Sequence, residues 1–447
     1  ASSDQHLWAE KYDRDIKDIF AVQDEVANAI ANALRIKLSD EETMMISESL
    51  TESIEAYDYY IKGRTLSYFY EGDKREEAIK YYKKAIQIDP EYALPYAGIS
   101  RVRMSQVVNQ VIENDFTTRA LKEAEEYSKK AVLHSIVDIN EKSRVHAKKF
   151  KVPFYKNSSA LIKLNKPDAV IVATPNQFHE KHTISFLNAK IPVLLEKPIS
   201  SNIEKAKKII SSSKKNKTNL LIGYHRRHNP IATKVKNKII KGKLGKIVSV
   251  NVMCWLYKNK EWFKEKWRIK KGGGPLGINL VHDIDLICYL LGPVVYVQAF
   301  SSNKIRKYEV EDTAIVNFIF KSGALGTLSV SDTIVSPWSY ELTAAENPAY
   351  PVTDQSAYYI GGTKSSIQFP NYKEWYNKSE RSWWKNIYHQ DSSTRDSRYT
   401  LVNQIDHLCD VVAGKAKPKV TGNDGLQSLK IFAAIIKSSK TGKKVKI

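Results

Sequence analysis

The chain has 447 residues, of which 42% are hydrophobic and 10% aromatic, so it can bury two or three separate cores and does not have the composition of a disordered protein. No stretch approaches about 18 consecutive apolar residues and the first residues do not read as a secretory signal, so no membrane span or signal peptide is expected. The three cysteines, Cys254, Cys288 and Cys409, lie far apart, which argues against a disulfide framework and favours a cytoplasmic location.

The net charge of +21 is unevenly divided along the chain, with about −7 on residues 1–135 and about +28 on residues 136–447. A strongly basic segment can bind nucleic acid. Here the lysines are scattered and no aromatic stacking platform accompanies them, so we interpret them mainly as background composition. A surface for an anionic partner is the alternative. The change of sign indicates two parts of different character.

The first part, residues 1–135, is expected to be helical. Apolar residues recur three and four positions apart over Asp15–Leu38, the spacing of one helix face. A pair of antiparallel helices is expected from Ala56 to Pro90, and a second unit from near Tyr96 to Ala131. An ordinary helical hairpin is the simplest alternative.

Small and large residues alternate within this pair of helices, at Ala78, Tyr82, Ala85 and Pro90. That rhythm resembles the second helix of a tetratricopeptide repeat, where small residues let neighbouring helices approach closely. Together with Leu7–Arg14, it makes the segment similar to the repeat region of TolB-like, cyclase-associated bacterial proteins. The resemblance implies a protein partner for this segment.

From residue 136 the pattern changes to strands and helices in alternation, which is typical of a doubly wound parallel sheet. The strands contain unbroken apolar runs, as expected when both faces of a sheet are covered. The expected elements are the strand Ile136–Asp138, the helix Glu141–Phe150, the strand Ala169–Ala173, the helix His179–Ala189, the strand that ends before Glu196, the helix Ile203–Lys214 and the strand Leu220–Tyr224.

Beyond about residue 245 the strands lengthen and alternate, which predicts a second domain with a large antiparallel sheet. The predicted domains are a helical segment (1–135), a partial dinucleotide-binding domain (136–245) and a substrate and oligomerisation domain (246–447). The main elements expected in the last domain are the strands Ile247–Trp255, Thr313–Phe320 and Ala324–Asp332 and the helices Thr400–Ala413 and Asp424–Thr441.

Two motifs stand out in the second part of the chain. The strand before Glu196-Lys197-Pro198 would place a lysine at the carboxyl edge of a parallel sheet, where ligands bind and where burial can lower the pKa of the amine. The second motif, 272–285, has three glycines before a helix that carries His282, a side chain suited to moving a proton. Neither His179/His182 nor His225/His228 has the carboxylate or cysteine company that a metal prefers, so no metal site is predicted.

The order of these motifs resembles the Gfo/Idh/MocA family of NAD(P)-dependent oxidoreductases from about residue 136 to the end. The resemblance implies hydride transfer between NAD or NADP and a hydroxyl carbon of a sugar, inositol or other polyol, with Lys197 and His282 as catalytic residues. It also implies a homo-oligomer formed through the flat face of the second sheet. The competing hypothesis is a non-catalytic scaffold that acts through its helical repeats.

The resemblance also implies roles for individual residues. Asp138 would accept hydrogen bonds from the adenosine ribose and favour NAD, with a helix N-cap as the alternative role. One position that is often an aspartate in the family is Ile278 here. The expected cofactor-binding residues are Asp138, Thr174, Pro175, Asn176, His179, Glu196, Lys197 and Pro198. The expected substrate-binding residues are Arg226, Arg227, Trp267, Arg268, Asn279 and His282.

A dinucleotide site of this kind begins with a strand, a Gly-x-Gly-x-x-Gly turn and a helix. These elements should precede Ile136 by about 25–30 residues, yet residues 106–135 contain no glycine. The sequence therefore predicts a Rossmann domain without its first unit, and with it impaired cofactor binding.

Overall fold

The computed structural model describes residues 51, 53–67, 72–96, 98–99, 131–347, 350–391 and 400–447. The chain divides into two compact units, Ala1–Asn109 and Gln110–Ile447. In the described part of the chain, no helix has the length and apolar character needed to cross a membrane.

The described part of the first unit is built on two helices, α3 (Ile54–Ser67) and α4 (Gly72–Ile88). Their contact buries small residues against tyrosines, with Ala78 and Ala85 fully buried and Tyr82 packed beside them. This confirms the predicted pair of helices that ends before Pro90. The tetratricopeptide assignment has no support beyond this pair, and the predicted helix Asp15–Leu38 lies outside the described residues.

The second unit begins with short parallel strands that form two separate sheets. Strand β1 (Ile136–Val137) pairs with β2 (Phe154–Tyr155), and β3 (Val170–Val172), β4 (Val193–Leu195) and β5 (Leu220–Ile222) form the other sheet. In a doubly wound sheet of strand order 3-2-1-4-5-6, β2 and β1 correspond to strands 3 and 2, and β3, β4 and β5 correspond to strands 4, 5 and 6. Among the described residues no strand occupies position 1, and Val137 and Tyr155 of the first sheet pack in the same core as Val172 of the second.

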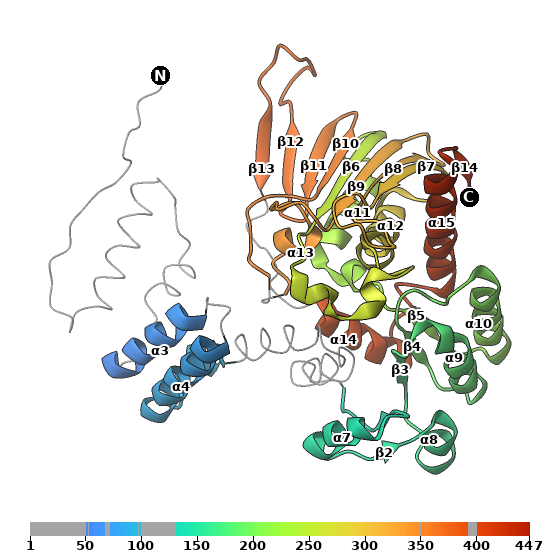
Figure 1. Ribbon diagram of the computed structural model, residues 1–447. Helices are drawn as coiled ribbons and strands as arrows, with labels where there is room; N and C mark the ends of the chain where they lie inside the picture. The colour runs from blue at the N-terminus through green and yellow to red at the C-terminus, as the bar shows by residue number, and fades with distance from the viewer. Residues whose placement is uncertain are drawn as a thin grey trace, which may run out of the picture. The chain divides into compact units, whose positions relative to one another are not determined.

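Helices cover both faces of the β3–β5 sheet (Figure 1). On one face Leu195 and Ile222 pack against α10, and on the other Leu194 and Leu221 pack against α14. The helices of this region are α7 (Arg144–Phe150), α8 (Ser158–Leu164), α9 (His179–Asn188), α10 (Ile203–Asn216) and α14 (Thr400–Val412). The predicted helices and strands of this domain are confirmed to within a few residues.

The second domain is a nine-stranded mixed sheet backed by helices (Figure 1). Its strand order is β13-β12-β11-β10-β6-β9-β8-β7-β14, and only β6 and β9 pair in parallel. The sheet was predicted to be antiparallel throughout, so this central pair is a correction. The strands are β6 (Ile247–Trp255), β7 (Val294–Ser302), β8 (Thr313–Phe320), β9 (Leu325–Ser331), β10 (Tyr358–Gly362), β11 (Ser365–Phe369), β12 (Lys373–Tyr376), β13 (Tyr388–Asp391) and β14 (Val445–Lys446).

One face of this sheet packs on three helices, α11 (Pro230–Ile240), α12 (Val281–Leu291) and α15 (Gly422–Thr441). Helix α15 starts with a capping box between Thr421 and Asp424, which satisfies its first amide groups. The helix contributes Leu429 to the core of the parallel sheet and Ile431 to the core of the large sheet. It therefore ties the two domains into one body.

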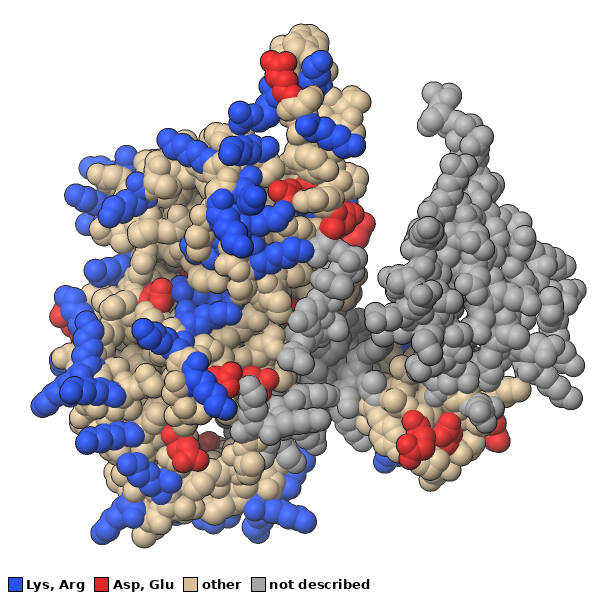
Figure 2. Space-filling view, turned by 180° about the vertical axis from the view of Figure 1, so that it is seen from behind, with Lys and Arg blue, Asp and Glu red and all other residues tan. Residues whose placement is uncertain are grey.

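Basic side chains spread over the surface of the second unit. Figure 2 shows lysine and arginine side chains distributed across the visible face, with a few carboxylates among them rather than one continuous stripe. This distribution fits the interpretation of the lysines as background composition.

Candidate active site

The strands β3, β4 and β5 are parallel, so the residues that follow them meet at one edge of the sheet. Thr174, Lys197 and Gly223 all lie at this edge. A Cβ at Gly223 would stand 2.9 Å from the Glu196 carboxylate, which explains why glycine is needed there. The peptide bond between Lys197 and Pro198 is cis.

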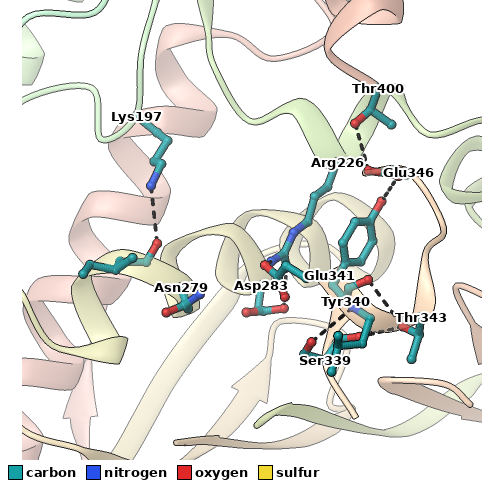
Figure 3. A network of polar contacts seen from close by, with 12 residues as sticks. Lys197, Arg226, Asn279, Asp283, Ser339, Tyr340, Glu341, Thr343, Glu346 and Thr400 are labelled. Atoms are coloured by element: carbon teal, nitrogen blue, oxygen red, sulfur yellow. Dashed lines mark hydrogen bonds and ion pairs between the residues drawn. The ribbon is translucent and has the colours of Figure 1, made fainter. Parts of the chain in front are cut away.

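Lys197 reaches from this edge to the second domain. Its Nζ donates a hydrogen bond of 3.3 Å to the carbonyl oxygen of Ile278 (Figure 3). Ile278 lies in a π-helical turn, Leu276–Leu280, which leads directly into α12. Burial lowers the pKa of Lys197 from its usual value, the adjacent Glu196 carboxylate opposes that shift, and the Arg226 guanidinium adds to it. The Lys197 ammonium therefore gives up its proton more readily than the ammonium of a surface lysine does.

His282 lies in the first turn of α12, and its ring is held by two aromatic neighbours. The ring centroids of Tyr224 and His225 lie 5.9 Å and 5.0 Å away, both in edge-on geometry. Burial holds the pKa of His282 well below its usual value, and the Lys197 ammonium lowers it further. The imidazole is therefore neutral at physiological pH. Its Nδ1 is buried with no hydrogen-bond partner in the structure, so a ligand atom can pair with it.

His179, predicted to contact the cofactor, instead links two loops of the site. Its ring nitrogens lie 2.9 Å from the Pro198 carbonyl oxygen and 2.7 Å from the Thr174 carbonyl oxygen, and the side chain is fully buried. Burial lowers the pKa of His179, so the neutral ring donates to one carbonyl at a time. The Thr174 hydroxyl beside it is buried without a partner, whereas Pro175 and Asn176 are exposed on the loop.

Asp138 follows β1, as predicted. Its two carboxylate oxygens accept hydrogen bonds from the Asn140 amide at 2.9 Å and the Ser143 hydroxyl at 2.6 Å. The N-cap of the next helical turn is instead Asn140, whose side chain accepts a hydrogen bond from the Lys142 amide, so the alternative role of Asp138 as a helix N-cap is wrong. A carboxylate has lone pairs for further donors, so the ribose contact stays a prediction.

Arg226 and Arg227 were predicted to bind substrate, but each pairs with carboxylates of the chain. Arg226 is 2% exposed and donates to Asp283 and to Glu341, each at 2.6 Å (Figure 3). Arg227 is also buried and makes two hydrogen bonds of 2.7 Å with Asp285. Both arginines therefore anchor α12 behind the site rather than facing a substrate with a free guanidinium group.

A polar network extends from Arg226 deeper into the domain. The ring of Tyr340 lies under the guanidinium at 4.3 Å, and the Tyr340 hydroxyl donates to Glu346 (Figure 3). Glu346 also accepts a hydrogen bond of 2.8 Å from Thr400 at the start of α14. Sequence reasoning did not identify this network, because its members are brought together only by the tertiary fold.

The remaining predicted residues gather near the π-helical turn. Asn279, in this turn, accepts a hydrogen bond of 2.7 Å from the Lys258 ammonium, a residue that sequence reasoning missed. The Arg268 guanidinium stacks on Trp262 at 3.8 Å and lies 5.4 Å from Trp267, which is half exposed. Contacts therefore link these side chains to the turn whose Ile278 carbonyl oxygen accepts a hydrogen bond from Lys197. Among the described residues, no cluster of three metal-type ligands occurs.

The edge of the β3–β5 sheet fits the reacting end of a dinucleotide. The unpartnered Thr174 hydroxyl and His282 Nδ1 supply polar atoms for a ligand, and Lys197 lies between the strand end and the second domain. The phosphate end is different, since the sequence has no glycine between Gly98 and Gly223. The expected position of the phosphate loop falls outside the described residues.

Two family models match the chain. The NAD-binding Rossmann fold of the GFO_IDH_MocA oxidoreductase family matches residues 114–224, and the C-terminal alpha/beta domain of that family matches residues 236–447. A myo-inositol 2-dehydrogenase of Thermotoga maritima is 25% identical over 338 residues, which are 71% of this chain and 91% of the relative. A 1,5-anhydro-D-fructose reductase of Ensifer adhaerens is 22% identical, over 63% of this chain and 80% of the relative.

Other similarities are shorter. A Rhizobium meliloti protein that bears the name of an adenylate cyclase is 38% identical over 105 residues, and a Bacillus subtilis relative is 27% identical over 135 residues. The chain spans only 18% and 32% of the lengths of these two relatives.

Solved structures share the fold of the second unit. The WlbA dehydrogenase of Bordetella pertussis, in complex with NADH and UDP-GlcNAcA, has a TM-score of 0.59 and 22% identity, over 73% of this chain and 93% of that one. A levoglucosan dehydrogenase in complex with NADH and levoglucosan has a TM-score of 0.61 and 19% identity, over 74% of this chain and 95% of that one.

Proposed function

Residues 114–224 and 236–447 are the NAD-binding and C-terminal domains of the Gfo/Idh/MocA oxidoreductase family, and we propose on that premise that the chain oxidises a hydroxyl carbon of a sugar or polyol. The observation that carries the proposal is the meeting of Lys197 and the π-helical turn before His282 at the carboxyl edge of the parallel sheet. The substrate class follows relatives named as a myo-inositol 2-dehydrogenase and a D-glucoside 3-dehydrogenase.

In the proposed reaction, Lys197 and His282 have different roles. Oxidation of an alcohol removes a hydride from carbon and a proton from oxygen, and the nicotinamide of bound NAD supplies the hydride acceptor. The Lys197 ammonium donates a hydrogen bond to the reacting oxygen and stabilises the negative charge that develops there. The neutral imidazole of His282 has a lone pair to accept the proton. Thr174, Glu196 and Pro198 follow the ends of β3 and β4 and would lie beside a nicotinamide bound at this edge.

The preference for NAD over NADP rests on Asp138 alone, because a carboxylate would repel a 2′-phosphate. The cytoplasmic location stays a prediction from the three separate free cysteines. The alternative of a non-catalytic scaffold is not favoured, because the oxidoreductase domains account for most of the chain.

Titration of the purified chain with NADH tests the proposal. Cofactor fluorescence should change with a dissociation constant in the micromolar range, and the thermal midpoint should rise, because a ligand that binds only the folded state stabilises it. NAD-dependent oxidation of myo-inositol and D-glucose should then be measured. If neither fluorescence nor the midpoint responds to saturating NADH, the proposed function is wrong.

We further propose that the open face of the nine-stranded sheet binds a second copy of the chain. Phe300 and Ile315 are directly opposed on β7 and β8, and both are about half exposed on the face that the helices leave uncovered. Leu325 adds a third exposed apolar side chain on β9 of that face.

The substitution Ile315→Lys should convert the dimer or tetramer to a monomer in analytical ultracentrifugation, because it places a charge in the proposed contact. The matched control, Ile240→Lys, changes an exposed isoleucine at the end of α11 and should leave the mass unchanged. A wild-type chain that sediments as a monomer would contradict the proposal.

A further inference from the structure

Lys258 is a buried cation without a partner of opposite charge. The residue is 7% exposed, and its Nζ donates one hydrogen bond, to the Asn279 side chain at 2.7 Å. Among the described residues no carboxylate oxygen lies within the 4.0 Å of an ion pair, and the nearby Asp332 pairs with Arg306 instead. An ammonium group has three donors, and buried charges are normally paired. The Lys258 ammonium can therefore donate further hydrogen bonds to a ligand that carries negative charge.

A second donor beside Lys258 is also without a partner. The Lys258 ammonium lies 4.7 Å from the ring centre of Trp262, and the Nε1–H of that ring is buried with no hydrogen-bond partner. An indole nitrogen can only donate. Two neighbouring groups thus have N–H donors available, which favours a ligand rich in acceptor oxygens and with negative charge.

The position of Lys258 relative to Lys197 places this region next to the reacting centre. Lys197 contacts the carbonyl oxygen of Ile278, and Lys258 contacts the side chain of the next residue, Asn279. Ile278 and Asn279 both belong to the π-helical turn that leads into α12. The two ammonium groups therefore contact consecutive residues of one turn.

We propose that the substrate carries an anionic group, a carboxylate or a phosphate, which binds Lys258 and the Trp262 N–H while the hydroxyl to be oxidised meets Lys197 and His282. This inference rests on the proposed function and narrows its substrate class from neutral polyols to acidic sugars. The Trp262 N–H and an ammonium group without a carboxylate partner together discriminate against an uncharged group at that position.

Thermal stabilisation by D-glucuronate, D-gluconate, glucose 6-phosphate, D-glucose and myo-inositol, each with NADH, tests this assignment. At least one acidic probe should stabilise the wild-type chain more than its neutral counterpart, and carboxylate and phosphate probes distinguish the two anionic groups. Lys258→Met should weaken binding of that acidic probe about 10- to 100-fold, the range for a hydrogen bond to a charged group. Binding of D-glucose should change less than about twofold.

Lys258→Arg and Trp262→Phe separate the effect of charge from that of folding. Lys258→Arg should retain part of the affinity, and Trp262→Phe should lower it while the aromatic contact remains. Lys260→Met, an exposed lysine two residues away, is the matched control and should bind like the wild type. Equal stabilisation by acidic and neutral probes, or an acidic preference that survives in Lys258→Met, would overturn the inference. If the wild-type chain does not bind NADH, the result counts against the proposed function itself.

Discussion

Replacing Lys197 with methionine is expected to lower kcat by about 10²- to 10³-fold, the range for removing one donor that stabilises developing negative charge. Methionine keeps the length and the apolar stem of the side chain but removes the donor that reaches toward Ile278. The fold should be retained, because the lysine contributes a single long hydrogen bond to it. Steady-state kinetics with NAD and a sugar substrate, together with the thermal midpoint, measure both effects.

The pH dependence of the reaction provides a second test of Lys197. Because burial lowers the pKa of this lysine, activity should fall on the alkaline side at a pH below that of an ordinary lysine. The ammonium form stabilises the reacting oxygen, so activity is present below this pKa and is lost as the pH rises through it. Lys197→Arg should move that limb to higher pH. Lys215→Met changes an exposed lysine of α10 and should leave the profile as it is. A Lys197→Met chain with wild-type kcat would show that the lysine has no role in catalysis.

Replacing Arg226 with methionine is expected to lower the free energy of unfolding by about 3–5 kcal/mol, the cost of breaking a buried ion pair from one side. The substitution leaves the buried Asp283 carboxylate and the partly buried Glu341 carboxylate beside an apolar side chain. It also removes the cation that lies over Tyr340. Urea unfolding monitored by circular dichroism measures the change in free energy.

Neutralising the two carboxylates identifies the cause of the Arg226 effect. The triple variant Arg226→Met, Asp283→Asn, Glu341→Gln should recover part of the lost stability, because it no longer buries uncompensated charge. Arg144→Met, which removes an exposed ion pair with Glu141, should give no measurable change in the urea midpoint. If the triple variant were no more stable than the single one, uncompensated charge would not be the cause of the loss, and the lost packing of the arginine would be the better explanation.

Features that depend on neighbouring residues in the sequence were predictable. The strand before Lys197 and the glycine turn before His282 each lie within one short segment, so apolar runs and turn residues identify them. The pair of helices in the first unit follows from the spacing of Ala78, Tyr82 and Ala85 in the same way. Local patterns of this kind are fixed by backbone preferences and by the periodicity of buried positions.

Features that depend on distant residues were not predictable. Arg226 meets Asp283 across 57 positions and Glu341 across 115, so no pattern near the arginine reveals that it is paired. A buried arginine and a substrate-binding arginine look alike in a sequence. The burial of Lys258 without a carboxylate partner is equally hidden, because a lysine after a strand usually lies in water. The parallel pairing of β6 and β9 follows from tertiary topology alone.

The separation of the β1–β2 pair from the β3–β5 sheet affects how the protein responds to its cofactor. Asp138 ends one sheet and Thr174 ends the other, and among the described residues no backbone ladder joins the two. A dinucleotide that contacts Asp138 at one end and Thr174 at the other would link the two sheets. Contact with both sheets would favour one arrangement of them, and the free energy needed for that restraint would be subtracted from the free energy of cofactor binding.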